Sequence, residues 1–244
     1  MQPFYDKDGI TIYNGNCFDV FDYLKNNNFK TDLVLTDPPY GTTACEWDKI
    51  PDLDKLWVDL KLLSNKQTVF VFTATQPFTS KLIMSNLKWF KYEWIWDRIR
   101  GTGFQICNVR PLIQHENIVV FCDGKAKYNP QKVEKDKPVK GGKVGKKQEA
   151  IPTPKYENRI ITHSFPKSIL SYSKDTGLHP TQKPLEMMEY LIRTYTDEWQ
   201  LVFDPFMGSG TTLLAAKKQK RRAVGIEMNL EYCEIAKKRL EECS

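Results

Sequence analysis

The hydrophobic pattern predicts alternating strands and helices along most of the chain. Short apolar, β-branched runs alternate with segments in which apolar residues recur at helical spacing. The run at 68–73 is continuously apolar, which is typical of a parallel strand buried on both faces. The predicted strands are 9–14, 32–36, 68–73, 90–96, 117–122, 201–203 and 223–226, and the predicted helices are 17–24, 53–63, 77–87, 184–195, 211–218 and 230–240. With 244 residues, the chain is predicted to form one large α/β domain with a small insertion.

One predicted strand ends in the tetrapeptide Asp37-Pro38-Pro39-Tyr40. The prolines stop the strand, which places the Asp37 carboxylate and the Tyr40 ring just past its end, where open α/β sheets bind ligands. The Asp37 carboxylate and the Pro38 carbonyl can each accept one N–H of an exocyclic amine, which directs the nitrogen lone pair away from them. Tyr40 can stack on the ring that carries the amine. The pattern therefore indicates methyl transfer to a planar amine, and the alternative is an ordinary strand-ending turn.

A glycine-rich turn near the C-terminal end provides a second candidate site. Residues 204–212 follow a short strand, and a helix, another strand and Glu227 come next, as in nucleoside-binding βαβ units. Gly208 and Gly210 permit close approach of a ligand, and Glu227 can accept hydrogen bonds from ribose hydroxyls. No Gly-Lys-Ser/Thr follows the glycines, which excludes a phosphate-binding P-loop. An ordinary glycine-rich connection is the alternative, but the first motif favours a nucleoside cofactor.

The two motifs, in this order, resemble the β-group of S-adenosylmethionine-dependent amino-methyltransferases of DNA. The resemblance implies a doubly wound, mostly parallel sheet of the class I methyltransferase type in circularly permuted order, with one antiparallel strand near its edge. It also implies that strand 10–13 lies beside the strand that ends at Glu227. In that group a target-recognition insertion separates two halves of one domain. The implied parts are a catalytic half at 1–123, a basic target-recognition insertion at 124–178 and a cofactor-binding half at 179–244.

The resemblance also assigns individual site residues. The implied catalytic residues are Asp37, Pro38, Pro39 and Tyr40. The implied cofactor-binding residues are Asn16, Asp37, Thr181, Lys183, Asp204, Phe206, Gly208, Ser209, Gly210, Thr211 and Glu227. Thr181 and Lys183 would meet the cofactor carboxylate, although a solvated lysine in a Pro-bounded loop is an equal alternative. Asn16 departs from the family, which usually has an aspartate there, so its side-chain oxygen is a weaker, uncharged acceptor for the adenine amine of the cofactor.

The basic charge is concentrated in the predicted insertion. The net charge is +6, and residues 124–155 contain ten lysines and three acidic residues, so the rest of the chain carries −1. We expect the stretch 140–147 to be mobile in the free protein. The lysines proposed to neutralise DNA phosphates are Lys140, Lys143, Lys146 and Lys147. A solvated linker is the alternative for each lysine alone, and sequence reading is expected from 154–178 or 98–110.

Together these features predict transfer of a methyl group from S-adenosylmethionine to N6 of a flipped-out adenine in double-stranded DNA. The resemblance favours adenine over cytosine-N4, because the related cytosine-N4 enzymes of this motif order more often carry serine where this chain has Asp37. The alternatives are a cytosine-N4 DNA methyltransferase, a methyltransferase acting on RNA or a small amine, and an inactive DNA-binding protein. A homodimer and a cognate restriction endonuclease are the further partners considered.

The remaining composition predicts a cytoplasmic protein without a metal. The six cysteines are scattered and the three histidines lack ligand spacing, so free thiols and ordinary histidines are expected. No apolar run reaches membrane-spanning length, and the first residues lack the basic and apolar regions of a signal peptide.

Overall fold

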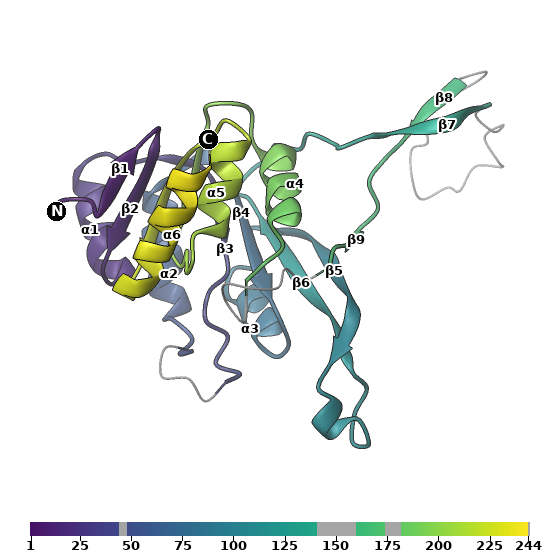
Figure 1. The fold of residues 1–244 in the computed structure, drawn as a ribbon, viewed down its shortest axis with the longest axis horizontal. Helices are drawn as coiled ribbons and strands as arrows, with labels where there is room; N and C mark the ends of the chain where they lie inside the picture. Colours follow the sequence, from purple (N-terminus) through teal and green to yellow (C-terminus); the bar gives the residue numbers. More distant parts are fainter. Residues whose placement is uncertain (44–47, 141–159, 174–181, 244) are drawn as a thin grey trace. The chain divides into compact units, whose positions relative to one another are not determined.

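The computed structural model describes residues 1–43, 48–140, 160–173 and 182–243, which divide into a main unit and a smaller second unit. The main unit comprises 1–129 and 168–244, and the second comprises 130–167. Across the described ranges, the main unit contains one nine-stranded sheet in the order β1-β2-β11-β10-β3-β4-β6-β5-β9 (Figure 1). Its strands are β1 (Tyr5–Lys7), β2 (Ile10–Asn14), β3 (Thr31–Thr36), β4 (Ser64–Ala74), β5 (Phe90–Thr102), β6 (Ile113–Phe121), β9 (Ile169–Ser171), β10 (Leu201–Asp204) and β11 (Arg222–Glu227). The helices are α1 (Cys17–Asn26), α2 (Leu53–Leu62), α3 (Phe78–Ser85), α4 (Leu185–Tyr195), α5 (Thr211–Lys218) and α6 (Leu230–Glu242), with one 3-10 turn, η1 (Phe104–Ile106).

The centre of the sheet is parallel, which confirms the predicted fold class. β2, β11, β10, β3 and β4 pair in parallel, whereas β6 is antiparallel to both β4 and β5. The short β1 adds a second antiparallel strand at one edge. Asn14 pairs with Glu227, so the N-terminal strand completes the sheet beside β11, as the circularly permuted order implies.

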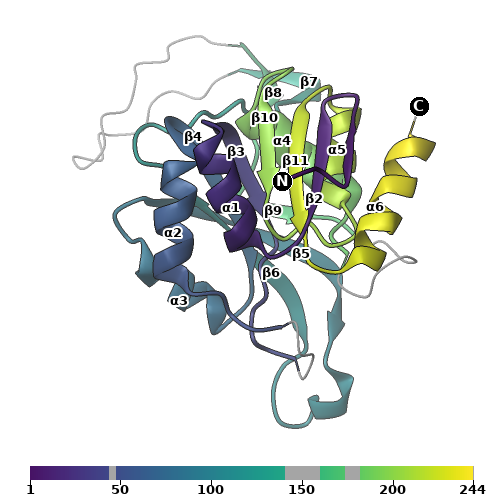
Figure 2. The same cartoon turned by 90° about the vertical axis from the view of Figure 1, so that its left-hand side faces the viewer.

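Both faces of the sheet are covered by helices, which explains the continuous apolar runs. Alternate residues of β3 point to opposite faces, with Leu33 and Leu35 in one core cluster and Val34 in the other. Helices α4, α5 and α6 pack on the Leu33 face, and α1, α2 and α3 pack on the Val34 face (Figure 2). All three side chains are fully buried, and each such burial contributes about 1.5–3 kcal/mol to stability.

The chain order places the ligand edge of the sheet between β10 and β3. From β10 the chain runs through α5 to β11, whereas from β3 it runs through α2 to β4 on the opposite side. Adjacent parallel strands whose connections leave in opposite directions form a topological switch point, where a crevice opens at the carboxyl ends. The turn after Thr36 and the turn after Asp204 therefore lie side by side.

The second unit is a two-stranded antiparallel ribbon. It consists of β7 (Val133–Lys140) and β8 (Ile160–Ser164), in which Lys140 pairs with Ile160. Almost all of its side chains are exposed, so these strands lack the apolar alternation from which a strand is predicted. The unit lies within the predicted insertion 124–178, whereas Asn129 donates from its backbone to the Thr194 carbonyl in the main unit, at 2.7 Å. The expected mobility of 140–147 concerns residues outside the described ranges, except for Lys140.

None of the helices in the described part of the chain is long and apolar enough to cross a membrane.

Candidate active site

Both predicted motifs line one cavity at the carboxyl edge of the sheet. The cavity has a volume of about 850 Å³, and Tyr40 and Gly208 both contribute to its wall. The predicted site residues that line it are Asn16, Asp37, Pro38, Pro39, Tyr40, Lys183, Asp204, Phe206, Gly208, Ser209, Thr211 and Glu227. Gly210 does not line the cavity. Its φ is +77°, and a Cβ there would come within 2.6 Å of the Ala236 Cβ. Thr181, Lys143, Lys146 and Lys147 lie outside the described residues.

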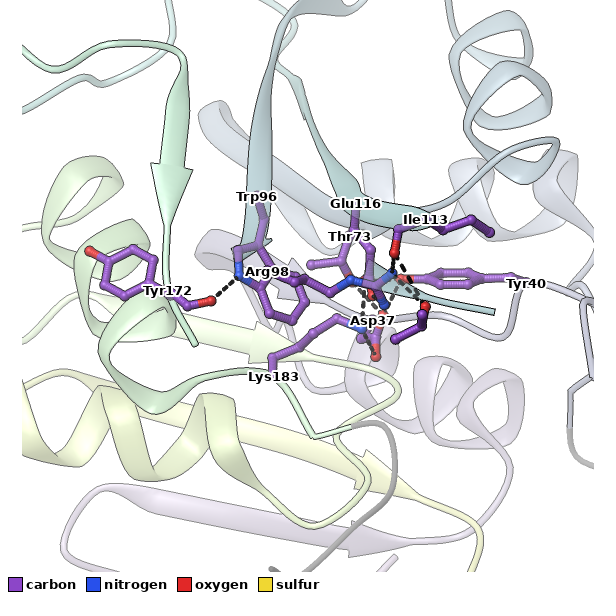
Figure 3. A network of polar contacts seen from close by, with 10 residues as sticks. Asp37, Tyr40, Thr73, Trp96, Arg98, Ile113, Glu116, Tyr172 and Lys183 are labelled. Carbon is purple, nitrogen blue, oxygen red and sulfur yellow. Dashed lines mark hydrogen bonds and ion pairs between the residues drawn. The ribbon is translucent and has the colours of Figure 1, made fainter. Parts of the chain in front are cut away.

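The Asp37 carboxylate is bound by three donors. The hydroxyls of Tyr40 and Thr73 donate to Oδ1, and the ammonium of Lys183 lies 2.8 Å from Oδ2 (Figure 3). Thr73 comes from the carboxyl end of β4, the parallel neighbour of β3. Asp37 remains 27% exposed, so the carboxylate is fixed in position yet accessible from the cavity.

Lys183 is a buried cation that joins two carboxylates. Its Nζ lies 2.8 Å from Asp37 and 3.2 Å from Glu116, while its side chain is only 7% exposed. Burial acts to lower the pKa of Lys183, but Asp37 and Glu116 outweigh burial and raise it, so the ammonium stays charged. The predicted contact between Lys183 and the cofactor carboxylate stays a prediction, because the partners of Lys183 in the structure are Asp37 and Glu116.

The Tyr40 ring is fixed by its neighbours. Phe78 stacks on it with ring centroids 5.3 Å apart and planes inclined by 26°, and Lys183 Nζ lies 5.6 Å from its centroid. Burial and the charge of Asp37 raise the pKa of Tyr40 well above its usual value, so the hydroxyl stays protonated and donates.

Asp48 ties down the loop that follows Tyr40. Its carboxylate, 6% exposed, accepts hydrogen bonds from four successive backbone N–H groups at 2.7–2.9 Å. The donors are Tyr40, Gly41, Thr42 and Thr43. Burial acts to raise the pKa of Asp48, but these bonds outweigh it and hold the pKa below its usual value.

Asp204 links the second motif to the first. Thr36, the last residue of β3, donates from its hydroxyl to Asp204 Oδ1 at 2.6 Å, and the Phe206 amide donates to the same atom at 3.1 Å. Burial raises the pKa of Asp204 to about 6; its hydrogen bonds oppose that shift, and the charge of Asp37 adds to it. This carboxyl group therefore titrates near neutrality.

Glu227 closes the glycine-rich turn from the adjacent strand. Its carboxylate accepts from the Gly208 amide at 3.1 Å and from the Asn229 amide at 2.8 Å. Burial raises the pKa of Glu227, and these backbone donors oppose the rise. From α6, Arg239 donates to the Ser209 carbonyl at 2.6 Å and so fixes the far side of the turn.

Asn16 caps helix α1 at the edge of the cavity. Its side-chain oxygen accepts from the Phe18 amide at 2.9 Å, which satisfies one free N–H of the first helical turn. An amide oxygen has a second lone pair, so the role assigned to Asn16 toward an adenine amine stays a prediction.

Comparison with known proteins identifies the family. The N6/N4 methyltransferase family model, described as DNA methylase, matches residues 31–238. The chain belongs to this family. It is 28% identical to the Type II methyltransferase M.HpaI of Haemophilus parainfluenzae over 92% of this chain and 73% of the relative, and 26% identical to M2.MboI of Moraxella bovis over 99% and 92%. A solved M1.HpyAVI–SAM complex superposes with a TM-score of 0.68 at 28% identity, covering 95% of this DNA methylase and 98% of that chain.

Three residues of the DNA methylase site were not found by sequence reasoning. Thr73 carried a usable signal, since it ends a predicted strand parallel to the motif strand. Asp48 and Glu116 carried none, because each is one acidic residue whose partners are set by the folded backbone. Arg98, in the region expected to read sequence, also contacts Glu116, at 3.2 Å.

Replacement of Asp48 by asparagine should loosen the loop that follows Tyr40 in the DNA methylase. An amide has one oxygen where the carboxylate has two, so about half of the four N–H groups lose their acceptor and face an NH2 group instead. We expect Asp48→Asn to lower the free energy of unfolding by about 1–3 kcal/mol, measured by urea denaturation at pH 7. The bonds of Asp48 stabilise above its unfolded pKa and are lost as pH falls through the lower folded pKa, so the difference should shrink in acid.

Asp52→Asn is the matched control for this prediction. Asp52 accepts one backbone N–H, from Lys55 at 3.0 Å, as the N-cap of α2, and asparagine caps helices equally well. Equal effects of the two substitutions would contradict the role given to Asp48.

The buried Asp204 should make the DNA methylase less stable as pH rises. Its pKa is about 6 in the folded protein against 3.8 for an ordinary aspartate, so the folded state binds the extra proton between these values. The free energy of unfolding must therefore fall from pH 4 to pH 6 by this contribution. Asp204→Asn should remove this fall. At pH 7 its free energy of unfolding should exceed that of the natural protein by about 1–3 kcal/mol.

Chemical denaturation at pH 4, 5, 6 and 7 measures this effect. The exposed Asp123 provides the control, since Asp123→Asn should follow the pH profile of the natural protein. A difference in free energy of unfolding between Asp204→Asn and the natural protein that stays constant from pH 4 to pH 7 would argue against the assignment.

Proposed function

We propose that this protein transfers a methyl group from S-adenosylmethionine to N6 of an adenine that is flipped out of double-stranded DNA. The observation that carries the proposal is the shared cavity, in which the Asp37–Tyr40 turn faces the turn at Gly208. One turn presents hydrogen-bond acceptors and an aromatic ring, and the other presents backbone beside a carboxylate. An amine and a methyl donor can therefore meet between them.

The residues present fit S-adenosylmethionine. A Cβ built on Gly208 would have no atom within 4 Å, so the backbone there faces open space. Glu227 projects beside it as the acceptor for ribose hydroxyls, and Asn16 lies at the expected adenine end. The residues proposed around the methionine part are Lys183, Asp204, Phe206, Ser209, Gly210 and Thr211, together with Thr181 from the segment outside the described residues. When bound, the cofactor supplies a methyl group on a positively charged sulfur.

The target amine is prepared by Asp37 and Pro38. Its lone pair is delocalised into the base, so an N–H bond to the Asp37 carboxylate and another to the Pro38 carbonyl are needed to aim it at the methyl carbon. The nitrogen forms its bond to that carbon as the carbon–sulfur bond breaks and sulfur keeps the electron pair. The positive charge passes to nitrogen and is removed when one N–H proton leaves to water. Tyr40, supported by Phe78, stacks on the base.

Duplex DNA is the proposed partner, since an enzyme must flip its target base out of the stack to act on it. Lys140 is exposed in the second unit and is proposed to meet DNA phosphates with Lys143, Lys146 and Lys147. The aspartate at position 37 favours adenine over cytosine. The names of M.HpaI and M2.MboI as Type II methyltransferases support a role in restriction–modification, with a cognate endonuclease and a homodimer as proposed partners.

Identification of the methylated base tests the proposed substrate. Purified protein with labelled S-adenosylmethionine should transfer label to unmethylated duplex DNA and not to RNA of matched sequence. Digestion to nucleosides and mass spectrometry should find N6-methyladenine. Label found on cytosine N4 would replace adenine, and transfer to RNA alone would replace the substrate class.

Removal of the Asp37 carboxylate tests the catalytic assignment. Asp37→Ala should lower kcat by at least about a hundredfold, because the amine loses the acceptor that aims its lone pair. Calorimetric binding of S-adenosylmethionine should remain measurable, since the glycine-rich turn and Glu227 are untouched. A variant with full turnover would refute the role of Asp37.

A further inference from the structure

Four charged side chains alternate in sign from the hairpin of β5 and β6 to the catalytic carboxylate. Arg98 lies 3.2 Å from Glu116, Glu116 lies 3.2 Å from Lys183, and Lys183 lies 2.8 Å from Asp37 (Figure 3). Asp37 is the most exposed of the four at 27%, and the other three are 7–14% exposed. The two cations and two carboxylates balance, and all four residues line the cavity, with Asp37 the most accessible from it.

The spatial alternation of these charges matters for the reaction, because Lys183 without a second carboxylate would oppose the reaction. Methyl transfer moves a positive charge onto a nitrogen held by Asp37, and a buried ammonium within contact of the same carboxylate disfavours that charge. A second carboxylate in contact with the ammonium offsets its field. Glu116 occupies this position, and its other oxygen is held by Arg98.

Arg98 is itself held by the backbone and side chains of the hairpin. Its guanidinium donates to the Ile113 carbonyl at 2.7 Å and to the Thr102 hydroxyl at 3.1 Å. These bonds fix Arg98, which fixes Glu116, so the position of the balancing charge is set by the pairing of β5 with β6. The arrangement is therefore built into the fold before any substrate binds.

We propose that Glu116 is a positioning residue for methyl transfer, which balances the Lys183 ammonium so that Asp37 presents a negative potential to the amine as it becomes positive. This inference rests on the proposed function and adds to it a charged group of the cavity wall whose effect on the amine is exerted through Lys183. Glu116 acts through Lys183, and Lys183 acts through Asp37.

Glu116→Gln tests the proposal because it removes the charge and keeps the shape. The four groups then carry one net positive charge, which should lower kcat roughly tenfold to a hundredfold at saturating substrates. Binding gives a second readout without turnover. The affinity for S-adenosylmethionine, a sulfonium, should fall about three- to tenfold relative to that for S-adenosylhomocysteine, a neutral thioether. Both molecules carry the same carboxylate, so their ratio does not depend on a contact between Lys183 and that group.

The double variant Glu116→Gln/Lys183→Gln separates charge from structure. It removes one charge of each sign and restores the balance, so it should recover the affinity ratio. The ratio alone is the readout for this variant, because Lys183 also holds Asp37 and its loss lowers kcat independently. Glu93→Gln is the matched control: Glu93 is exposed on β5 and accepts one hydrogen bond, from Asn117 at 2.9 Å, outside the alternating charges. It should leave both readouts unchanged.

The outcomes distinguish this inference from the proposed function. A natural protein without transfer to DNA would refute the proposed function itself. A natural protein that methylates DNA, with Glu116→Gln unchanged in kcat and in affinity ratio, would overturn only the role of Glu116. The same holds if Glu116→Gln weakens both cofactor forms equally, or if the double variant fails to recover the affinity ratio, since a loss of packing alone would produce these results.

Discussion

The parallel pairing of β3 with β10 is the constraint on which the site depends. Leu33 pairs with Val202 and Val34 with Phe203, so the two strands end at the same edge of the sheet. Their connections leave in opposite directions, and the crevice at this point receives one motif from each strand. The hydrogen bond from Thr36 to Asp204 joins the two turns directly. Asp37 and Asp204, which are 167 positions apart in the sequence (204 − 37), thereby reach one cavity, and a shift of this register would separate them.

The burial of charged groups is the second constraint, and the site stabilises its carboxylates in two ways. Asp204 is buried, and no cation among the described residues forms an ion pair with it, so its pKa rises to about 6 and hydrogen bonds from neutral groups hold it. Asp37 and Glu116 instead share Lys183, whose pKa is raised by both carboxylates. A buried pair of opposite charges is costly unless its geometry is good, and an ammonium between two carboxylates meets that condition. Asp204 is thus held by neutral donors, whereas Asp37 is held by an ion pair together with the hydroxyls of Tyr40 and Thr73.

The strands at the centre of the sheet and the two motifs could be predicted from the sequence. The exposed strands and the contacts of Asp48 and Glu116 could not. β3, β4, β10 and β11 are buried on both faces, so their apolar runs are easily recognised. The ribbon β7–β8 was missed because its strands are exposed and charged, and β5 extends to Thr102 through residues with no apolar alternation. The partners of Asp48 and Glu116 are defined by a loop closure and by antiparallel register. Neither leaves a periodic trace in the sequence.

Several contacts within the protein hold the residues of the site in fixed positions. Asp48 fixes four successive amides from Tyr40 onward, Phe78 fixes the Tyr40 ring, and Lys183 fixes Asp37, all without substrate. In the proposed reaction the amine would need the positions at Asp37 Oδ1 that the hydroxyls of Tyr40 and Thr73 occupy. An incoming N–H therefore replaces a hydroxyl donor and leaves the carboxylate where it is. Exchange of one hydrogen bond for another costs little, whereas moving a buried carboxylate away from its ammonium costs much more, so the site holds the charge still and lets the neutral donors move.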